Sequence, residues 1–109
     1  MIGVGIDMTR VSRFQSCATL SRVADFVLHE SEHAEFVSAK NKAYFLAGRF
    51  AVKEALYKAS SGAVRYTDIA CGHSDSGALL VSIFPKQIGS PLVSVSYEGD
   101  CVVALAYIV

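Results

Sequence analysis

The chain has 109 residues, of which ten are basic and ten acidic, so its formal net charge at neutral pH is zero. Proteins that bind nucleic acid generally carry a basic excess, and the balanced charge argues against that class. Hydrophobic residues make up 52% and charged residues 18%, which predicts one well-buried domain over residues 1–109, with apolar surface left over for an oligomer interface.

Cysteine usage and hydropathy favour a cytoplasmic protein. Cys17, Cys71 and Cys101 fit neither a disulfide framework nor a zinc spacing, so we expect three reduced, mostly buried thiols. The longest apolar run covers residues 101–109, whereas a membrane-spanning helix needs about 20 residues. We therefore expect a buried strand there, and no membrane partner. Asp7 interrupts the first apolar run and no basic segment precedes it, so we expect no targeting segment.

The chain opens with the alternation of a strand. One face carries apolar side chains, and the other carries Gly3, Gly5 and Asp7. Glycine weakens a strand unless another group must approach its backbone closely. The Asp7 face is therefore either packed tightly on a helix or left open for a ligand.

Residues 8–20 are expected to turn into a helix with a basic outer side. Arg10 and Arg13 are three residues apart, and Arg22 follows further along the chain. Such a face is often no more than a solvated surface, but it would also suit an acidic protein partner.

A second, short helix is expected over residues 30–40, with Ala34, Phe36 and Val37 facing inward. Residues 29–33 match the zinc-protease pattern H-E-x-x-H. The match is weak, because it lies at the start of a polar helix and only His73 remains as a further histidine ligand. We therefore favour a solvated helix start over a zinc protease.

Residues 45–59 predict a long central helix, because good helix formers dominate them. Arg49 and Lys53 are four residues apart, as are Glu54 and Lys58, so each pair lies on one side of the helix. Ordinary surface ion pairs are one interpretation, and a functional cluster is the other.

The remaining chain predicts strands. We expect them at residues 67–71, 78–84, 92–97 and 102–108, separated by turn residues. The fold class is therefore α+β: an N-terminal strand, helices including one long central helix, and a C-terminal antiparallel β-meander.

Asp7 and Glu54 would meet if the central helix packed on the glycine face of the first strand. Two carboxylates repel each other at close range unless they hold a cation. Magnesium prefers oxygen ligands and uses one or two carboxylates together with water and phosphates. Arg49, Lys53 and Lys58 could then surround an anionic substrate, which predicts a phosphoryl-transfer site without a phosphate-binding loop.

Two segments closely resemble the holo-[acyl-carrier-protein] synthase family, the small bacterial-type 4′-phosphopantetheinyl transferases. They are G-I-D at residues 5–7 and F-L-A-G-R-F-A-x-K-E-A-x-x-K-A at residues 45–59. Supporting matches continue through Gly62, residues 68–69 and 74–77, and V-S-V-S at residues 93–96. The resemblance covers essentially the whole chain.

The resemblance implies transfer of 4′-phosphopantetheine from coenzyme A to a serine of apo acyl carrier protein, with release of adenosine 3′,5′-bisphosphate. It implies Mg2+ as cofactor, a homotrimer whose sites lie between two protomers, and a role in fatty acid biosynthesis and lipid metabolism. A non-catalytic module on the same scaffold that binds coenzyme A or the carrier protein is the alternative.

The family also implies roles for individual residues. Asp7 and Glu54 match its magnesium ligands, and Glu54 is our candidate base. Catalytic residues would be Glu54, Asp7 and Lys58. Coenzyme A would be bound by Arg49, Lys53, Lys58, Gly62, Ser96 and Tyr97. The carrier protein would contact Arg10, Arg13 and Arg22.

Three positions carry further expectations. Tyr97 stands where the family usually has histidine, which removes a group that can be cationic near neutral pH. His29 replaces the usual threonine before the second helix and should be a poorer cap. Gly48 makes sense if the central helix lies close against the strand that contains Gly3 and Gly5.

Overall fold

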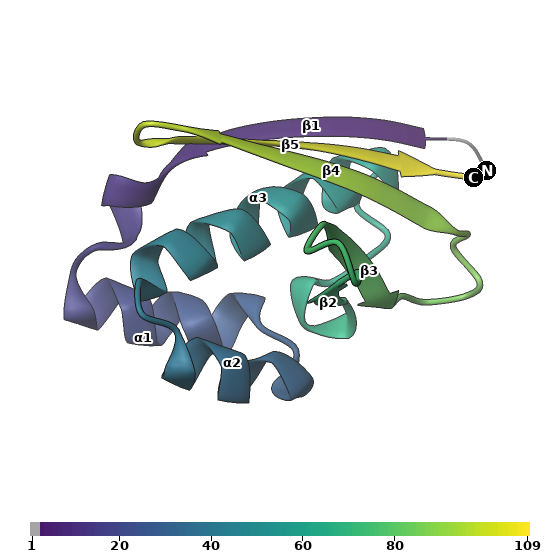
Figure 1. The fold of residues 1–109 in the computed structure, drawn as a ribbon. Helices are drawn as coiled ribbons and strands as arrows, with labels where there is room; N and C mark the ends of the chain where they lie inside the picture. The colour runs from purple at the N-terminus through teal and green to yellow at the C-terminus, as the bar shows by residue number, and fades with distance from the viewer. Residues whose placement is uncertain (1–2) are drawn as a thin grey trace.

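The computed structural model of the protein describes residues 3–109, and it confirms the α+β class (Figure 1). Three helices follow the first strand, and the last four strands follow the helices. The elements are β1 (Gly3–Arg10), a 3-10 turn (Val11–Phe14), α1 (Cys17–Val27), a 3-10 turn (Glu30–Glu32), α2 (His33–Ser38), α3 (Lys42–Ala59), a 3-10 turn (Tyr66–Asp68), β2 (Ala70–His73), β3 (Leu79–Ile83), β4 (Pro91–Glu98) and β5 (Cys101–Ile108).

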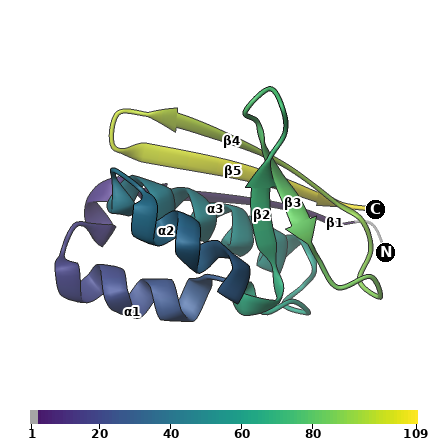
Figure 2. The same cartoon turned by 60° about the horizontal axis from the view of Figure 1, so that its bottom comes forward.

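The strands form two sheets. A three-stranded antiparallel sheet has the order β1-β5-β4, so the first and last strands of the chain pair side by side. Among residues 3–109, strands β2 and β3 pair only with each other and do not continue the predicted meander. Helix α3 lies under the three-stranded sheet, with α1 and α2 on its other side, and the β2–β3 hairpin crosses next to α3 (Figures 1 and 2).

The glycine face of β1 is packed tightly on α3. A Cβ atom added to Gly3 would lie 1.9 Å from the carbonyl oxygen of Ala59, and one added to Gly5 would lie 2.0 Å from that of Ala55. At Gly3 and Gly5, close packing on a helix is therefore the interpretation that the structure supports. Only residues without side chains allow this approach of strand and helix backbones.

Gly48 has a different partner from the expected one. A Cβ atom at Gly48 would lie 2.1 Å from the hydroxyl oxygen of Tyr97 on β4. The central helix does lie close against the strand of Gly3 and Gly5, but the expectation that this contact explains Gly48 is wrong. The small residue makes room for a tyrosine ring instead.

The outer face of the three-stranded sheet is apolar and uncovered in this chain. Val4 is 65% exposed and Ile6 is 60% exposed, because the glycine face of β1 points inward. The expected partner of these two side chains on the outer face, Ile2, lies outside the described residues. Other exposed apolar side chains of the three strands are Met8, Leu92, Leu105 and Tyr107.

The first helix begins later than predicted. Strand β1 continues to Arg10 because its pairing with β5 runs on to Cys101. Helix α1 starts only at Cys17, where the Ser16 side chain accepts a hydrogen bond from the backbone of Thr19. Cys17 is exposed, so the expectation of buried thiols is wrong at this position.

Other boundaries differ for similar local reasons. Helix α3 begins at Lys42, about one turn earlier than predicted, because Asn41 caps it by accepting a hydrogen bond from the backbone of Tyr44. Helix α2 was expected to bury Ala34, Phe36 and Val37, but Ala34 and Val37 are exposed.

None of the described helices is long and apolar enough to cross a bilayer.

We predict that Gly5→Ala lowers the free energy of unfolding by about 1–3 kcal/mol, because the new methyl group would force β1 away from α3. Urea titration at one fixed protein concentration measures the change. Gly72→Ala is the matched control, since its Cβ would meet its nearest neighbour at an ordinary 3.9 Å. Equal stabilities of the two variants would contradict the close-packing account.

Candidate active site

Asp7 lies where β1 crosses the C-terminal half of α3. The ammonium group of Lys58 is 3.3 Å from Oδ1 of Asp7 and donates to the carbonyl oxygen of Ile6 at 3.0 Å. The Asp7 side chain is only 13% exposed, and its other oxygen, Oδ2, is buried without a hydrogen-bond partner among the described residues. A buried carboxylate oxygen without a partner is unfavourable unless a ligand completes it.

Glu54 approaches the same carboxylate from α3. Burial raises the pKa of Asp7, the hydrogen bond and charge of Lys58 lower it, and the nearby charge of Glu54 raises it again. The net effect is a raised pKa, so the surrounding protein leaves the negative charge of Asp7 incompletely compensated.

These two carboxylates fit a hard divalent cation. They supply oxygen ligands, and one of the oxygens is buried without a partner. Within residues 3–109, no group of three or more His, Cys, Asp or Glu side chains is placed to hold a metal ion. Such a small donor set suits magnesium, which commonly keeps one or two protein carboxylates and takes its other ligands from water and phosphate.

Tyr66 holds Glu54 in a contact that no pattern in the sequence indicates. The phenol hydroxyl donates to Oε2 of Glu54 from a 3-10 turn that follows α3. Burial is the largest effect that raises the pKa of Tyr66, and the hydrogen bond to Glu54 is the next largest. The phenol therefore stays a protonated donor. No periodicity links position 66 to position 54, because an irregular segment separates the two elements.

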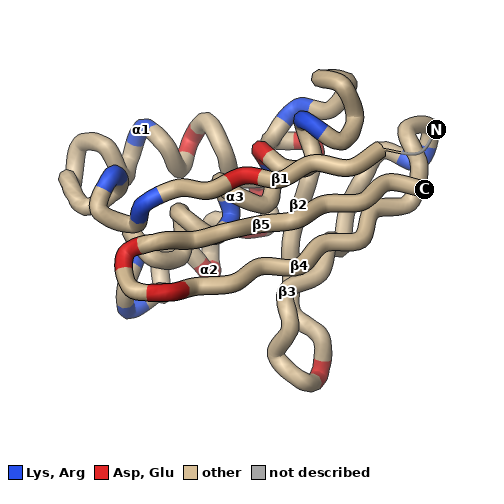
Figure 3. Tube along the Cα trace, turned by 90° about the horizontal axis from the view of Figure 1, so that it is seen from above, with Lys and Arg blue, Asp and Glu red and all other residues tan. Residues whose placement is uncertain are grey.

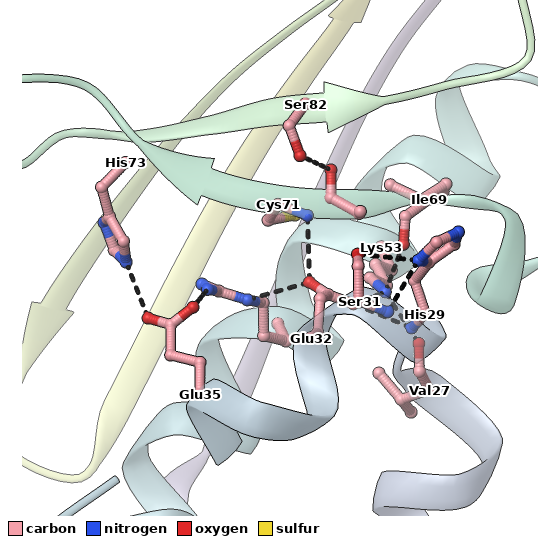
Figure 4. A network of polar contacts seen from close by, with 12 residues as sticks. Val27, His29, Ser31, Glu32, Glu35, Lys53, Ile69, Cys71, His73 and Ser82 are labelled. Atoms are coloured by element: carbon pink, nitrogen blue, oxygen red, sulfur yellow. Dashed lines mark hydrogen bonds and ion pairs between the residues drawn. The ribbon is translucent and has the colours of Figure 1, made fainter. Parts of the chain in front are cut away.

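Arg49 and Lys53 lie in a different place: Arg49 contacts Glu32 and Glu35, and Lys53 contacts Glu32 (Figure 4 shows Lys53 and both glutamates). The Lys53 ammonium group is fully buried and donates to Oε1 of Glu32 at 2.5 Å and to the carbonyl oxygens of Val27 and Ile69 at 2.8 and 2.6 Å. Burial lowers the pKa of Lys53, and the charge of Glu32 opposes this effect. All three ammonium protons have internal acceptors.

Glu32 is the centre of this buried network. Its Oε2 lies 3.0 Å from Nε of Arg49 in an ion-pair contact and accepts a hydrogen bond from the backbone of Cys71 at 3.0 Å. Arg49 also donates to Glu35, whose second oxygen lies 3.4 Å from the ring of His73 (Figure 4). The network ties α2, α3 and β2 together.

The start of the second helical segment is better capped than expected. Nδ1 of His29 accepts a hydrogen bond from the backbone of Ser31, and Glu32 accepts one from the backbone of His29. This reciprocal capping box shows that the expectation of a poor cap is wrong. Of the three residues that define the H-E-x-x-H match, His29 serves as this cap.

Tyr97 and Ser96 are separate from the Asp7 site. Tyr97 stacks on Tyr44 with ring centroids 4.3 Å apart, and both line a cavity of about 320 Å³ together with Arg49 and His73. Burial raises the pKa of Tyr97, so it is a neutral group at physiological pH. Ser96 is exposed on the other face of β4.

The candidate residues therefore form two groups on one helix. Asp7, Glu54 and Lys58 gather at the C-terminal half of α3, whereas Arg49 and Tyr97 lie toward its N-terminal half. Arg49 and Lys58 are nine positions apart, which corresponds to about 14 Å along the helix axis. The structure does not bring the two groups together within one chain.

Gly62 lies closer to the first group. It has φ of 81° and its backbone donates to the carbonyl oxygen of Tyr57 at 2.8 Å, which confirms the predicted end of the helix. Gly62 lines a cavity of about 610 Å³ together with Tyr57, Tyr66 and Phe26.

The predicted basic surface is present around α1. Figure 3 shows Lys and Arg positions on α1 and at the adjoining end of β1. Arg13 and Arg22 border a cavity of about 400 Å³ whose other side chains include Phe14, Phe26 and Phe50, whereas Arg10 is exposed at the end of β1. This cavity is therefore lined by aromatic side chains and bordered by two arginines.

The comparisons with known proteins agree on one family. Residues 3–106 match the model of the 4′-phosphopantetheinyl transferase superfamily. The chain therefore belongs to this superfamily.

Particular relatives narrow the relationship. The chain is 37% identical over 110 residues to a holo-[acyl-carrier-protein] synthase of Streptococcus thermophilus, covering 95% of this chain and 92% of the relative. The crystal structure of the Neisseria meningitidis holo-[acyl-carrier-protein] synthase is 28% identical, with a TM-score of 0.82 and coverage of 100% of this chain and 99% of that one. That of Bacillus anthracis, solved in complex with CoA (3′,5′-ADP), is 26% identical, with a TM-score of 0.82 and coverage of 97% and 94%.

We predict that Glu32→Ala destabilises the protein by about 3–5 kcal/mol, because it leaves Lys53 buried without a counter-charge and removes one of the two acidic partners of Arg49. Urea unfolding provides the measurement. Glu30→Ala removes an exposed glutamate from the same turn and should change stability by no more than about 0.5 kcal/mol. Similar losses in both variants would refute the central role of Glu32.

Proposed function

We propose that this chain transfers 4′-phosphopantetheine from coenzyme A to a serine hydroxyl of apo acyl carrier protein and releases adenosine 3′,5′-bisphosphate. The observation that carries this proposal is the pair Asp7 and Glu54 beside Lys58, with one buried carboxylate oxygen left without a partner. Membership of the 4′-phosphopantetheinyl transferase superfamily supplies the reaction class.

Magnesium is the proposed cofactor, with Asp7 and Glu54 as its protein ligands. When bound, it would neutralise charge on the pyrophosphate oxygens of coenzyme A. Lys58 is placed to add a second positive charge to the same region, since its ammonium group already lies against Asp7.

In the proposed reaction the serine oxygen forms a bond to the β-phosphorus, and the bond from that phosphorus to the bridging oxygen breaks. Glu54 is our candidate acceptor for the serine proton, and a base must lie within hydrogen-bond reach of the proton it takes. The bisphosphate leaves with the bridging oxygen. Most of the catalysis is then positioning and electrostatic stabilisation, as in phosphoryl transfer generally.

Coenzyme A is proposed to contact both groups of residues. Lys58 and Gly62 would lie near the reacting phosphate, and Arg49, Ser96 and Tyr97 would serve the more distant part of the molecule. The separation of the two groups along α3 favours a site that two protomers complete. Lys53 was also expected to bind coenzyme A, but its complete burial and its three internal acceptors argue for a structural role.

A homotrimer is the proposed assembly. The apolar outer face of β1, β5 and β4 supports it, because side chains such as Val4, Ile6 and Met8 are more than half exposed in the isolated chain. A large exposed apolar patch generally marks an interaction surface.

The proposed site for the carrier protein is the surface around α1. Arg13 and Arg22 would pair with acidic side chains of the carrier, and Phe26, which is 70% exposed, would contact its apolar residues. Arg10 extends the positive charge along β1.

We further propose a cytoplasmic location and a role in lipid metabolism.

A binding module without catalytic activity is the second candidate. The observation that favours it is Tyr97, a neutral side chain where the family usually carries histidine. Such a module would bind coenzyme A or the carrier protein but would not join the two.

The decisive assay incubates the protein with Mg2+, coenzyme A and apo acyl carrier protein and follows the carrier by mass spectrometry. We predict a mass gain of one phosphopantetheine group. Asp7→Ala and Glu54→Ala should each abolish the gain without loss of the folded oligomer, and Asp75→Ala, in the exposed β2–β3 turn, should leave it unchanged.

Full activity in both the Asp7→Ala and Glu54→Ala variants would disprove the metal-ligand assignment. Binding of coenzyme A without any transfer would disprove the transferase and leave the binding module.

A further inference from the structure

Tyr66 is fixed in place by an aromatic cluster at the end of α3. Its ring lies edge-on to three other rings, with centroid separations of 5.8 Å to Phe26, 6.0 Å to Phe50 and 6.1 Å to Tyr57. Phe26 belongs to α1, and Phe50 and Tyr57 lie about two turns apart on α3. The ring therefore has little freedom to move its hydroxyl group away from Glu54.

The hydroxyl of Tyr66 determines which oxygen of Glu54 remains available. It donates to Oε2 of Glu54, and no hydrogen bond from a described residue engages Oε1. The two oxygens of the Asp7 carboxylate differ in the same way: Oδ1 accepts a hydrogen bond from Lys58, whereas Oδ2 has no hydrogen-bond partner among the described residues. Each carboxylate thus has one oxygen that accepts a hydrogen bond from the protein and one oxygen that accepts none from the described residues.

We infer that Tyr66 is a positioning residue that orients the Glu54 carboxylate for a divalent cation shared with Asp7. The inference rests on the proposed function for the identity of the site, but not on the transfer reaction itself. Carboxylates that bind metals are themselves commonly hydrogen-bonded, and loss of such an outer partner typically weakens metal binding about 10- to 100-fold.

Tyr57 provides a matched control for Tyr66. Its ring belongs to the same cluster and contacts Tyr66 edge-on, but none of the hydrogen bonds of the described residues joins its hydroxyl to Glu54 or Asp7. Tyr57→Phe therefore removes a hydroxyl group from the same aromatic environment without touching the carboxylates.

The test is Mn2+ binding to the whole protein without carrier protein or coenzyme A, measured from the electron paramagnetic resonance signal of free Mn2+. We expect Tyr66→Phe to raise the Mn2+ dissociation constant at least about 10-fold and Tyr57→Phe to change it less than twofold. Thermal unfolding of both variants verifies that the aromatic cluster remains folded.

Equal Mn2+ affinity of the Tyr66→Phe variant and the unaltered protein, or no Mn2+ binding by the unaltered protein, would overturn the inference. In the transfer assay, Tyr66→Phe should raise the Mg2+ concentration that gives half-maximal rate and should recover most of its activity at saturating Mg2+. If the unaltered protein transfers no phosphopantetheine yet the Mn2+ result holds, only the proposed function fails.

Discussion

The backbone contact between β1 and α3 is the constraint on which the rest of the structure depends. Gly3 and Gly5 lie directly against the carbonyl oxygens of Ala59 and Ala55, where any side chain would collide. Asp7 follows on the same face of the strand, two residues after Gly5. It therefore arrives next to the helix residues that neighbour the two alanines, Glu54 and Lys58, and its carboxylate enters a buried position with one oxygen unsatisfied.

The same helix carries charge in two different electrostatic settings. Lys53 and Glu54 are consecutive, so their side chains point about 100° apart, one toward Glu32 and the other toward Asp7. The three ammonium protons of Lys53 all have internal acceptors, which suits a scaffold. Around Asp7 the negative charge is under-compensated, which suits the binding of a cation and, with it, of phosphate groups.

Sequence reasoning located the pair of carboxylates because both signals are local: glycines that alternate with apolar residues in a strand, and charges at helical spacing. It missed Tyr66 and Glu32 because their importance depends on partners that are distant in the chain. Glu32 stands in a polar stretch that is typical of a solvated helix start, although it is buried. The prediction for Gly48 failed for the same reason. A glycine in a helix indicates a close contact, but the sequence does not show that the contacting group is Tyr97 of β4.

The central claim is that β1 and α3 together build a divalent-cation site from Asp7 and Glu54. Anomalous diffraction from crystals of the protein grown with Mn2+ and coenzyme A tests it most directly. The account predicts an anomalous peak between the two carboxylates, within coordination distance of Oδ2 of Asp7 and Oε1 of Glu54. No peak at this position, or a peak only at other residues, would contradict it.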